Sequence, residues 1–430
     1  MNSSLMNVRR GEAHRATLAA LAWAAILVAP ALGHAQAAGA GDGGVSAFYA
    51  WKDAVPATPG KLLRSEPQEE KLALAGASRS VRILYSSTDG LDGHSPIAVS
   101  GALYLPRGAP PEGGWPLLAW AHGTVGIADV CAPSWAGRSE RDITYLNHWL
   151  DQGYAVVASD YQGLGTGGGH PYLTTRPEAY SVLDSVRAVE GGDFGLSKKV
   201  VIIGQSQGGG AAFAATVFAQ SYAPELDIRG TVATGTPNLS PAGFAANAKA
   251  NAEAANKVSP TFAYVLLVLY TIAQTDPSFA IADYVDDKAV ATTQLAQTAC
   301  LGAIEKQVVA EGLTFKNSFK KDPRKPLFAT AALMAYPTLK TAIPIFMGTG
   351  GKDLDVLPPG QERLAKDACA AGTRIEWRFY PDFDHSATVN GSLPDSTPFV
   401  KRAFAGETIE GNCAATLAGQ NSGDVTLTPT

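Results

Sequence analysis

The sequence predicts an α/β fold with a mostly parallel central sheet, helices on both faces of the sheet, and an inserted helical cap. Short apolar runs alternate with helical patterns over residues 116–233 and again over 343–404, which is typical of a parallel sheet. This rhythm stops between residues 237 and 341, where the chain is rich in Ala, Lys and Asn and has helical periodicity. The apolar run 200–203 leads directly into Gly204-Gln205-Ser206-Gln207-Gly208, a serine in a glycine turn before a small-residue helix.

The composition is that of a globular protein with a large core. The chain has 430 residues, of which 46% are hydrophobic and 17% are charged, so it can form one large domain or two ordinary ones. The net charge is −5 and no long basic run is present. Both observations argue against a nucleic-acid-binding protein.

Residues 1–37 are expected to be a secretory signal peptide rather than part of the fold. Three arginines precede the apolar run 16–32, and small residues follow it at the expected cleavage positions Ala35 and Ala37. A retained membrane anchor is the alternative, but the run falls short of about twenty apolar residues and contains Pro30. The sequence therefore predicts a secreted or periplasmic protein.

Export makes the four cysteines candidates for two disulfides, because thiols oxidise outside the cytoplasm. Their spacing does not resemble a metal site. Three connectivities are possible. We favour Cys131 with Cys300 and Cys369 with Cys413, because each pair would tie a connecting segment back to the core.

The first part of the chain is expected to supply an irregular belt and then a hairpin. Residues 48–74 contain three prolines that break regular structure. Residues 80–86 and 97–105 are rich in Val, Ile and Tyr and are separated by glycines, which favours two antiparallel strands. The elements predicted after them are a strand at 117–121, a helix at 140–152, a strand at 154–160, a helix at 178–189, the strand 200–203, a helix to about 222 and a strand at 230–233.

The second part is expected to hold the cap and the end of the sheet. The segment 238–341 is interpreted as the cap, inserted in a catalytic domain that spans 38–413. Its apolar stretch 262–273 is too short to cross a bilayer. It could pack beneath the cap, line an acyl pocket, or be a core helix without a ligand role. The remaining predictions are strands at 343–348 and 374–380, helices at 360–371 and 397–404, and a frayed tail at 414–430.

The serine turn at 204–208 is interpreted as a nucleophile elbow. A side chain at Gly204 or Gly208 would collide with the neighbouring strand or helix, so glycine allows the turn to close and leaves Ser206 at the sheet edge. The alternative is a glycine turn with an incidental serine. The strand before the turn and the small-residue helix after it favour the elbow.

The order of residues along the chain restricts the partners of Ser206. A serine nucleophile needs a base and an acid that orients the base, and in this kind of sheet they follow in the order Ser, Asp or Glu, His. Of seven histidines only His385 follows the serine, just after the strand 374–380. The acid is expected at Asp353, after the strand 343–348, with Asp355 as the alternative.

Two amide groups are expected to stabilise the oxyanion of the tetrahedral intermediate. The amide of Gln207, first in the elbow helix, supplies one by position. The other is expected from Thr124, in the loop after the strand 117–121, where Gly123 permits close backbone approach. His122 in the same loop is expected to have a structural role.

A second glycine-rich loop, 160–172, follows another strand on the same edge. Tyr161 and Gln162 are candidate substrate-binding residues there, although a structural role is equally compatible with the sequence. The loop lacks the Gly-Lys-Ser/Thr ending of a phosphate-binding loop. No metal and no organic cofactor is expected.

Taken together, the residues resemble the secretory lipase family (lipase A type) of α/β-hydrolases and its exported bacterial esterase relatives. The resemblance extends over most of the mature chain and is carried by 59–67, 83–89, His122-Gly123-Thr124, 131–134, 160–165, 170–172, the elbow 204–208, Asp353 and His385. It implies an α/β-hydrolase fold, a Ser-Asp-His carboxylic ester hydrolase, a helical cap before the acid-bearing strand, and disulfides.

The expected function is hydrolysis of a small-molecule or lipid ester through an acyl-enzyme, with a possible transient contact to a lipid interface. No nucleic acid partner and no stable membrane span of the mature chain is expected. The alternatives are a serine peptidase or acyltransferase on the same scaffold, and a non-catalytic hydrolase fold that serves as a binding module.

Overall fold

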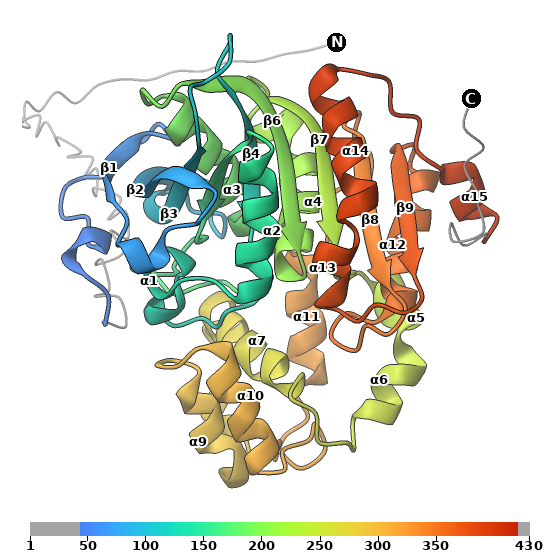
Figure 1. Ribbon diagram of the computed structural model, residues 1–430. Helices are drawn as coiled ribbons and strands as arrows, with labels where there is room; N and C mark the ends of the chain where they lie inside the picture. Colours follow the sequence, from blue (N-terminus) through green and yellow to red (C-terminus); the bar gives the residue numbers. More distant parts are fainter. Residues whose placement is uncertain (1–43, 420–430) are drawn as a thin grey trace, which may run out of the picture. The chain divides into compact units, whose positions relative to one another are not determined.

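The computed structural model describes residues 44–419, whose core is a nine-stranded sheet in the order β1-β2-β3-β5-β4-β6-β7-β8-β9 (Figure 1). The six strands from β4 to β9 run parallel to one another, and β1, β2 and β3 are joined antiparallel at the β5 end. This confirms the mostly parallel sheet. The expected signal peptide lies outside the described residues. The strands are β1 Leu62–Pro67, β2 Ala77–Thr88, β3 Pro96–Pro106, β4 Trp115–Ala121, β5 Ala155–Ser159, β6 Leu196–Gln205, β7 Asp227–Thr234, β8 Ile345–Gly350 and β9 Ile375–Tyr380.

The expectation of an irregular belt over residues 48–74 was wrong in part, because β1 lies within it. This strand pairs antiparallel with β2, and Ser65 is opposite Ile83. It is one edge strand of the sheet, and each of its side chains is half-buried or exposed. Its polar residues and the terminal Pro67 suit an edge position but hide the strand from a hydrophobic pattern.

Helices cover both faces of the sheet, as predicted. Alternate residues of β4 pack on opposite faces: Leu117 joins the core beneath α3 and α4, whereas Leu118 and Trp120 join the core beneath α2 and α14. In Figure 1, α2 and α14 lie in front of the sheet and α3 and α4 behind it. The helices around the sheet are α1 Pro133–Ala136, α2 Glu140–Asp151, α3 Thr175–Glu190, α4 Gln207–Tyr222, α12 Pro358–Ala370, α13 Ala387–Gly391, α14 Leu393–Ala405 and α15 Cys413–Leu417.

The segment between β7 and β8 is helical, as the loss of strand rhythm predicted. Its helices α7, α9, α10 and α11 gather beyond one end of the sheet (Figure 1). They form a hydrophobic core in which Leu266, Leu267 and Leu269 of α7 are fully buried, and which also includes Ile127 and Tyr172 from the loops after β4 and β5. Within residues 44–419, no helix is long and apolar enough to cross a membrane. The helices are α5 Pro241–Ala246, α6 Ala248–Ala254, α7 Phe262–Thr275, α8 Ile281–Tyr284, α9 Asp287–Leu295, α10 Leu301–Ala310 and α11 Arg324–Met334.

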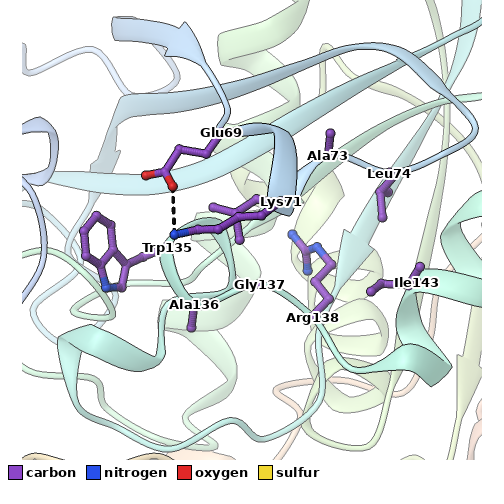
Figure 2. Close-up of a pocket in the computed structure, with 10 residues that line it drawn as sticks. Glu69, Lys71, Ala73, Leu74, Trp135, Ala136, Gly137, Arg138 and Ile143 are labelled. Atoms are coloured by element: carbon purple, nitrogen blue, oxygen red, sulfur yellow. Dashed lines mark ion pairs between the residues drawn. The ribbon is translucent and has the colours of Figure 1, made fainter.

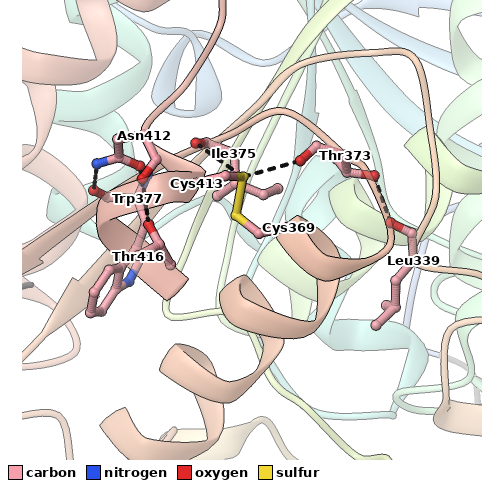
Figure 3. Close-up of a disulfide and its surroundings, with 8 residues drawn as sticks. All are labelled: Leu339, Cys369, Thr373, Ile375, Trp377, Asn412, Cys413 and Thr416. Carbon is pink, nitrogen blue, oxygen red and sulfur yellow. Dashed lines mark hydrogen bonds between the residues drawn. A yellow bond between two sulfur atoms is a disulfide. The ribbon is translucent and has the colours of Figure 1, made fainter. Parts of the chain in front are cut away.

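Both favoured disulfides are present. Cys131–Cys300 connects the segment after β4 to the start of α10, and Cys369–Cys413 connects α12 to α15 (Figure 3). The frayed tail expected from residue 414 instead begins with a short helix, α15. Just before this helix, the side chain of Asn412 accepts a hydrogen bond from the amide of Trp377 and donates one to its carbonyl oxygen, so it covers the open edge of β9.

Candidate active site

Ser206 lies in a strained turn between β6 and α4. Its φ of 61° and ψ of −126° belong to a region that residues with a side chain rarely adopt. A Cβ at Gly204 would overlap the carbonyl oxygen of Gly208, and a Cβ at Gly208 would overlap the carbonyl oxygen of Ala121 in β4. A side chain at either position would therefore collide as the sequence predicted, with the helix at Gly204 and with the neighbouring strand at Gly208.

The loop after β4 packs directly against this turn. A Cβ at Gly123 would lie 2.7 Å from Oε1 of Gln205 and 3.5 Å from the Cβ of Ser206, so a larger residue here would require the Gln205 side chain to shift. Thr124 follows, and its hydroxyl forms a hydrogen bond of 2.7 Å with the hydroxyl of Tyr172. The amide of Gln207 belongs to the first turn of α4, where amide groups have no partner within the helix.

His385 and Asp353 meet although they come from different loops. His385 follows β9 and Asp353 follows β8, and their Nδ1 and Oδ2 atoms are 2.8 Å apart. Both side chains are buried. The other oxygen of Asp353 accepts hydrogen bonds from the amides of Asp355 and Val356, at 2.9 and 2.8 Å. These donors fix the carboxylate with one oxygen toward the imidazole.

Asp355, the alternative acid, has a different partner. Its Oδ1 accepts a hydrogen bond of 2.7 Å from the hydroxyl of Tyr264, a residue of α7 in the cap. Asp353 is further held by Nε2 of Gln361, at 3.0 Å. The geometry therefore favours Asp353 as the partner of His385, and it assigns Asp355 to a contact between the cap and the sheet.

Asp353, Asp355 and His385 are also the group of residues within 44–419 that could hold a metal ion, because their ligand atoms lie within 4.8 Å of one another. However, amide N–H groups point at both oxygens of Asp353 and would repel a cation. The carboxylate is arranged to orient an imidazole, so its donors do not suit a metal site.

Gln205, which the sequence analysis did not single out, contacts the other nitrogen of the imidazole. Its Nε2 lies 2.8 Å from Nε2 of His385, and its Oε1 is buried without a hydrogen-bond partner. Among the described residues, the hydroxyl of Ser206 makes no hydrogen bond. The atom expected to accept the serine proton is thus engaged by a glutamine amide.

A buried network fixes the side chain of Gln207, and the sequence analysis missed it. Its Nε2 donates to Oε1 of Glu178 at 2.8 Å and lies 2.9 Å from Nε2 of His170. Burial raises the pKa of Glu178 to about 8 and lowers the pKa of His170 to about 4, so both side chains are neutral near pH 6. Buried polar residues on a helix and in a loop were the only signal for this network.

The two candidate substrate-binding residues have structural contacts. Tyr161 is fully buried with a φ of 73°, and its hydroxyl donates to the carbonyl oxygen of His122 at 2.9 Å. Gln162 donates to Asp89 at 2.8 Å and accepts from the amide of Gly90 at 2.9 Å. Both side chains hold the loops together, which favours the structural role that the sequence left open for them.

His122 has the structural role expected from the sequence. Its Nδ1 lies 2.7 Å from the carbonyl oxygen of Gly123 and its Nε2 lies 3.3 Å from that of Asp160. Burial lowers the pKa of His122 to about 3, so the ring stays neutral.

The candidate site is covered. Ser206 is 9% exposed and His385 is 8% exposed. A cavity of about 380 Å³ lies elsewhere, beside α1, and its only drawn ion pair joins Glu69 to Lys71 at 2.8 Å (Figure 2). None of the candidate catalytic residues lines this cavity. The residues that line it are Glu69, Lys71, Leu72, Ala73, Leu74, Trp135, Ala136, Gly137, Arg138 and Ile143.

The cap is attached to the loops that surround Ser206. In addition to the bond between Tyr264 and Asp355, Thr271 of α7 donates to the carbonyl oxygen of Tyr172 at 3.1 Å. The amide of Leu301 donates to the carbonyl oxygen of Val125 at 2.8 Å, next to the disulfide Cys131–Cys300. These contacts reach the loops after β4, β5 and β8, which also carry the candidate site.

Comparisons with known proteins identify the family and the fold. The model of the secretory lipase family matches residues 137–412. Lipase A of Moesziomyces aphidis is 26% identical over 400 residues, which is 85% of this chain and 70% of that protein. A probable inactive lipase of Mycobacterium tuberculosis is 30% identical over 192 residues, 41% of each chain.

Among solved structures, Candida antarctica lipase A is similar with a TM-score of 0.66 and 22% identity, covering 87% of this chain and 93% of that one. This similarity shows the fold alone, and the family match adds the class of enzyme. The family name and the two disulfides point to an exported protein. The chain therefore belongs to the secretory lipase family, has an α/β-hydrolase fold and is a carboxylic ester hydrolase.

Proposed function

We propose that this protein hydrolyses carboxylic esters through an acyl-enzyme on Ser206, with His385 as the base and Asp353 as the acid that orients it. The observation that carries the proposal is the 2.8 Å hydrogen bond between His385 and Asp353, which joins loops at the same sheet edge as the strained serine. These residues occur in the chain order expected for a hydrolase of this fold.

In the first step, Nε2 of His385 accepts the proton of Ser206 as Oγ forms a bond to the ester carbonyl carbon. The π electrons of the carbonyl move to its oxygen, and the amides of Gln207 and Thr124 donate hydrogen bonds to this oxyanion. The intermediate then collapses, its bond to the alcohol oxygen breaks, and Nε2–H of His385 protonates the departing alcohol. Water repeats the sequence on the acyl-enzyme and releases the acid.

Asp353 orients the imidazole and stabilises the imidazolium that forms in both steps. Its charge is already opposite Nδ1 and is held by the donors of its own loop and of Gln361, so little reorganisation is needed when the ring becomes charged. The preorganised carboxylate distinguishes this site from a simple His–Asp surface pair.

The domain organisation and location belong to the same proposal. A signal peptide at 1–37 directs the chain to the periplasm or the medium, 38–413 forms the catalytic domain, and 238–341 forms a cap that the substrate must pass. The substrate is an ester of a small molecule or a lipid. The contacts that α7 and α10 make with the loops around Ser206 support the interpretation of this segment as a cap.

A fluorescent alkyl phosphonate that labels active serines tests the proposal. We expect the wild-type protein to be labelled and Ser206→Ala to lose all labelling. Ser221→Ala is the matched control, because this serine lies near the exposed end of the same helix, α4, and should keep full labelling. A wild-type protein that is folded but not labelled would support the non-catalytic alternative, which the relative named a probable inactive lipase makes worth testing.

The alternative enzymes on the same fold, a serine peptidase and an acyltransferase, can be distinguished by their substrates. Initial rates on p-nitrophenyl esters from acetate to palmitate, beside peptide anilides, separate esterase, lipase and peptidase. Adding an alcohol acceptor and measuring the new ester separates an acyltransferase from a hydrolase. We expect ester hydrolysis, no anilide cleavage, and release of acid in preference to transfer.

A further inference from the structure

With the amide nitrogen of Gln205 toward His385, as in this structure, the hydrogens of the neutral ring have one consistent arrangement. An amide nitrogen is a donor only, so Nε2 of His385 must present its lone pair to it. The proton of the neutral ring then lies on Nδ1, where it is donated to Asp353. This is the tautomer that general-base catalysis requires, but the lone pair that should accept the Ser206 proton already has a donor.

The environment makes this contact strong. Gln205 is 1% exposed and His385 is 8% exposed, so water does not compete for either group. Gln205 is the last residue of β6 and its backbone is fixed by pairing with Thr234 of β7. Its other amide atom, Oε1, is buried near Gly123 without a partner.

Resting on the proposed function, we propose that Gln205 is a positioning residue that holds Nε2 of His385 in the covered enzyme and must release it before Ser206 can transfer its proton. The amide and the serine hydroxyl donate to the same lone pair, so the two hydrogen bonds exclude each other. Gln205 thereby favours the neutral ring and restrains acylation until a substrate enters.

A second orientation of the same amide suits the later step. When Nε2 of His385 carries the transferred proton, it becomes a donor, and rotation of the Gln205 amide brings Oε1 toward it as acceptor. The orphaned Oε1 would then have a partner. One side chain can therefore contact both protonation states of the base without movement of the backbone.

The charged groups around His385 are the same in wild type and variants. Asp353 and Asp355 face the ring from the loop after β8, and Asp384 adjoins it in its own loop. From α2, Arg141 reaches Ser386, and from the cap Tyr264 contacts Asp355. A substitution of Gln205 leaves all of them in place, so a shift between variants reports on the glutamine contact.

The test is the second-order rate of phosphonate labelling between pH 4.5 and 9 in wild type and Gln205→Met. Methionine has similar length but cannot donate to Nε2. We expect the acidic limb of the profile to move to higher pH by about 0.5 to 1 unit, because the neutral ring loses a donor. We also expect the alkaline plateau to rise by about fivefold, because Ser206 no longer has a competitor.

A matched control exists on the surface. Gln152 places its Nε2 2.7 Å from Nε2 of His148 in α2, so Gln152→Met removes the same kind of contact far from the triad loops. It should leave the profile unchanged. If the acidic limb of Gln205→Met stays in place, or if its plateau falls, the inference is overturned.

Gln205→Glu covers the possibility that the methionine variant does not fold, which thermal unfolding would reveal. A carboxylate opposite Nε2 should move the acidic limb to higher pH still and reduce labelling at neutral pH, whereas Gln152→Glu should not. An unmoved limb in Gln205→Glu also overturns the inference. If the wild-type protein is not labelled, the proposed function itself is overturned. If the wild type is labelled but the acidic limb of the Gln205 variants does not move, only the role of Gln205 is overturned.

Discussion

The carboxyl edge of the sheet and the cap beyond it are held in place in different ways. At the edge, Ser206 is positioned by backbone geometry, with glycines where no other residue fits. The cap shares a hydrophobic core with Ile127 and Tyr172 of the loops after β4 and β5, and it joins the edge through this packing, a few hydrogen bonds and the disulfide Cys131–Cys300. We therefore expect changes at the edge to have large effects and changes at the junction with the cap to have graded ones.

The largest effect is expected for Gly208→Ala. Its Cβ would overlap the carbonyl oxygen of Ala121, which belongs to a central strand and cannot move away cheaply. We expect a loss of about 3 kcal/mol or more in the free energy of unfolding, together with loss of labelling at Ser206. Urea unfolding measures the first and the phosphonate probe the second. Gly302→Ala, with open space at its Cβ, is the control. Equal stability of both variants would contradict the comparison.

The next effect is expected for the double variant Cys131→Ser, Cys300→Ser. The bond closes a loop with a sequence separation of 169, so its loss should lower the free energy of unfolding by about 2 to 5 kcal/mol. The double variant Cys369→Ser, Cys413→Ser removes the disulfide that closes the shorter loop, with a separation of 44, and should lower the free energy of unfolding by less. Hydrogen exchange should rise in α10 only for the first variant. A rise in both would mean that the cap is not specifically tethered by Cys131–Cys300.

A pH-dependent effect is expected for Glu178, which lies beneath the elbow. Its pKa is raised to about 8 by burial, so the folded protein holds a proton that the unfolded chain loses above about pH 4.5. The stability of the wild type should therefore fall as the pH rises from about 4.5 to about 8. Glu178→Gln, which stays neutral, should show a shallower fall. Urea unfolding of both proteins at pH 5.5 and 8.5 measures this fall in the free energy of unfolding. An equal fall in wild type and variant would exclude this role of the Glu178 carboxyl group.

The smallest effect is expected for Tyr264→Phe, which removes one hydrogen bond between the cap and the loop of Asp353. Because the acceptor is a half-buried carboxylate, the loss should be about 1 to 2 kcal/mol at this junction. We expect faster hydrogen exchange in the first turns of α7 and nearly unchanged global unfolding. Tyr270→Phe, which removes a bond within the cap, should not loosen the junction in this way.

The sequence predicted what depends on chain order and on local geometry. His385 was selected as the candidate base because a single histidine follows the serine, and its 2.8 Å bond to Asp353 fits the expected order. Gly204 and Gly208 were identified because the geometry of the turn depends only on residues that are adjacent in the sequence. The parallel strands were identified because each is a short apolar run. The two disulfides were favoured because each pair of cysteines would tie a connecting segment back to the core.

What the sequence did not predict depends on where side chains point after folding. Gln205 looked like a variable position of the serine motif, and only the approach of the loop after β9 shows that it contacts the base. The loop of Tyr161 and Gln162 was compatible with either a substrate contact or a structural role, and only the folded chain shows their hydrogen bonds to His122 and Asp89. The edge strand β1 lacks a hydrophobic face, so its pairing with β2 could not be detected from periodicity.

The bond between Cys131 and Cys300 also relates the cap to the redox state of its surroundings. One cysteine follows β4 and the other precedes α10, so oxidation requires that the sheet and the cap have already come together. Where glutathione keeps thiols reduced, no disulfide is lost at the serine turn itself, but the cap loses the one disulfide that joins it to the loop after β4 within residues 44–419. Recombinant material should therefore be produced under oxidising conditions if its substrate range is to represent the native protein.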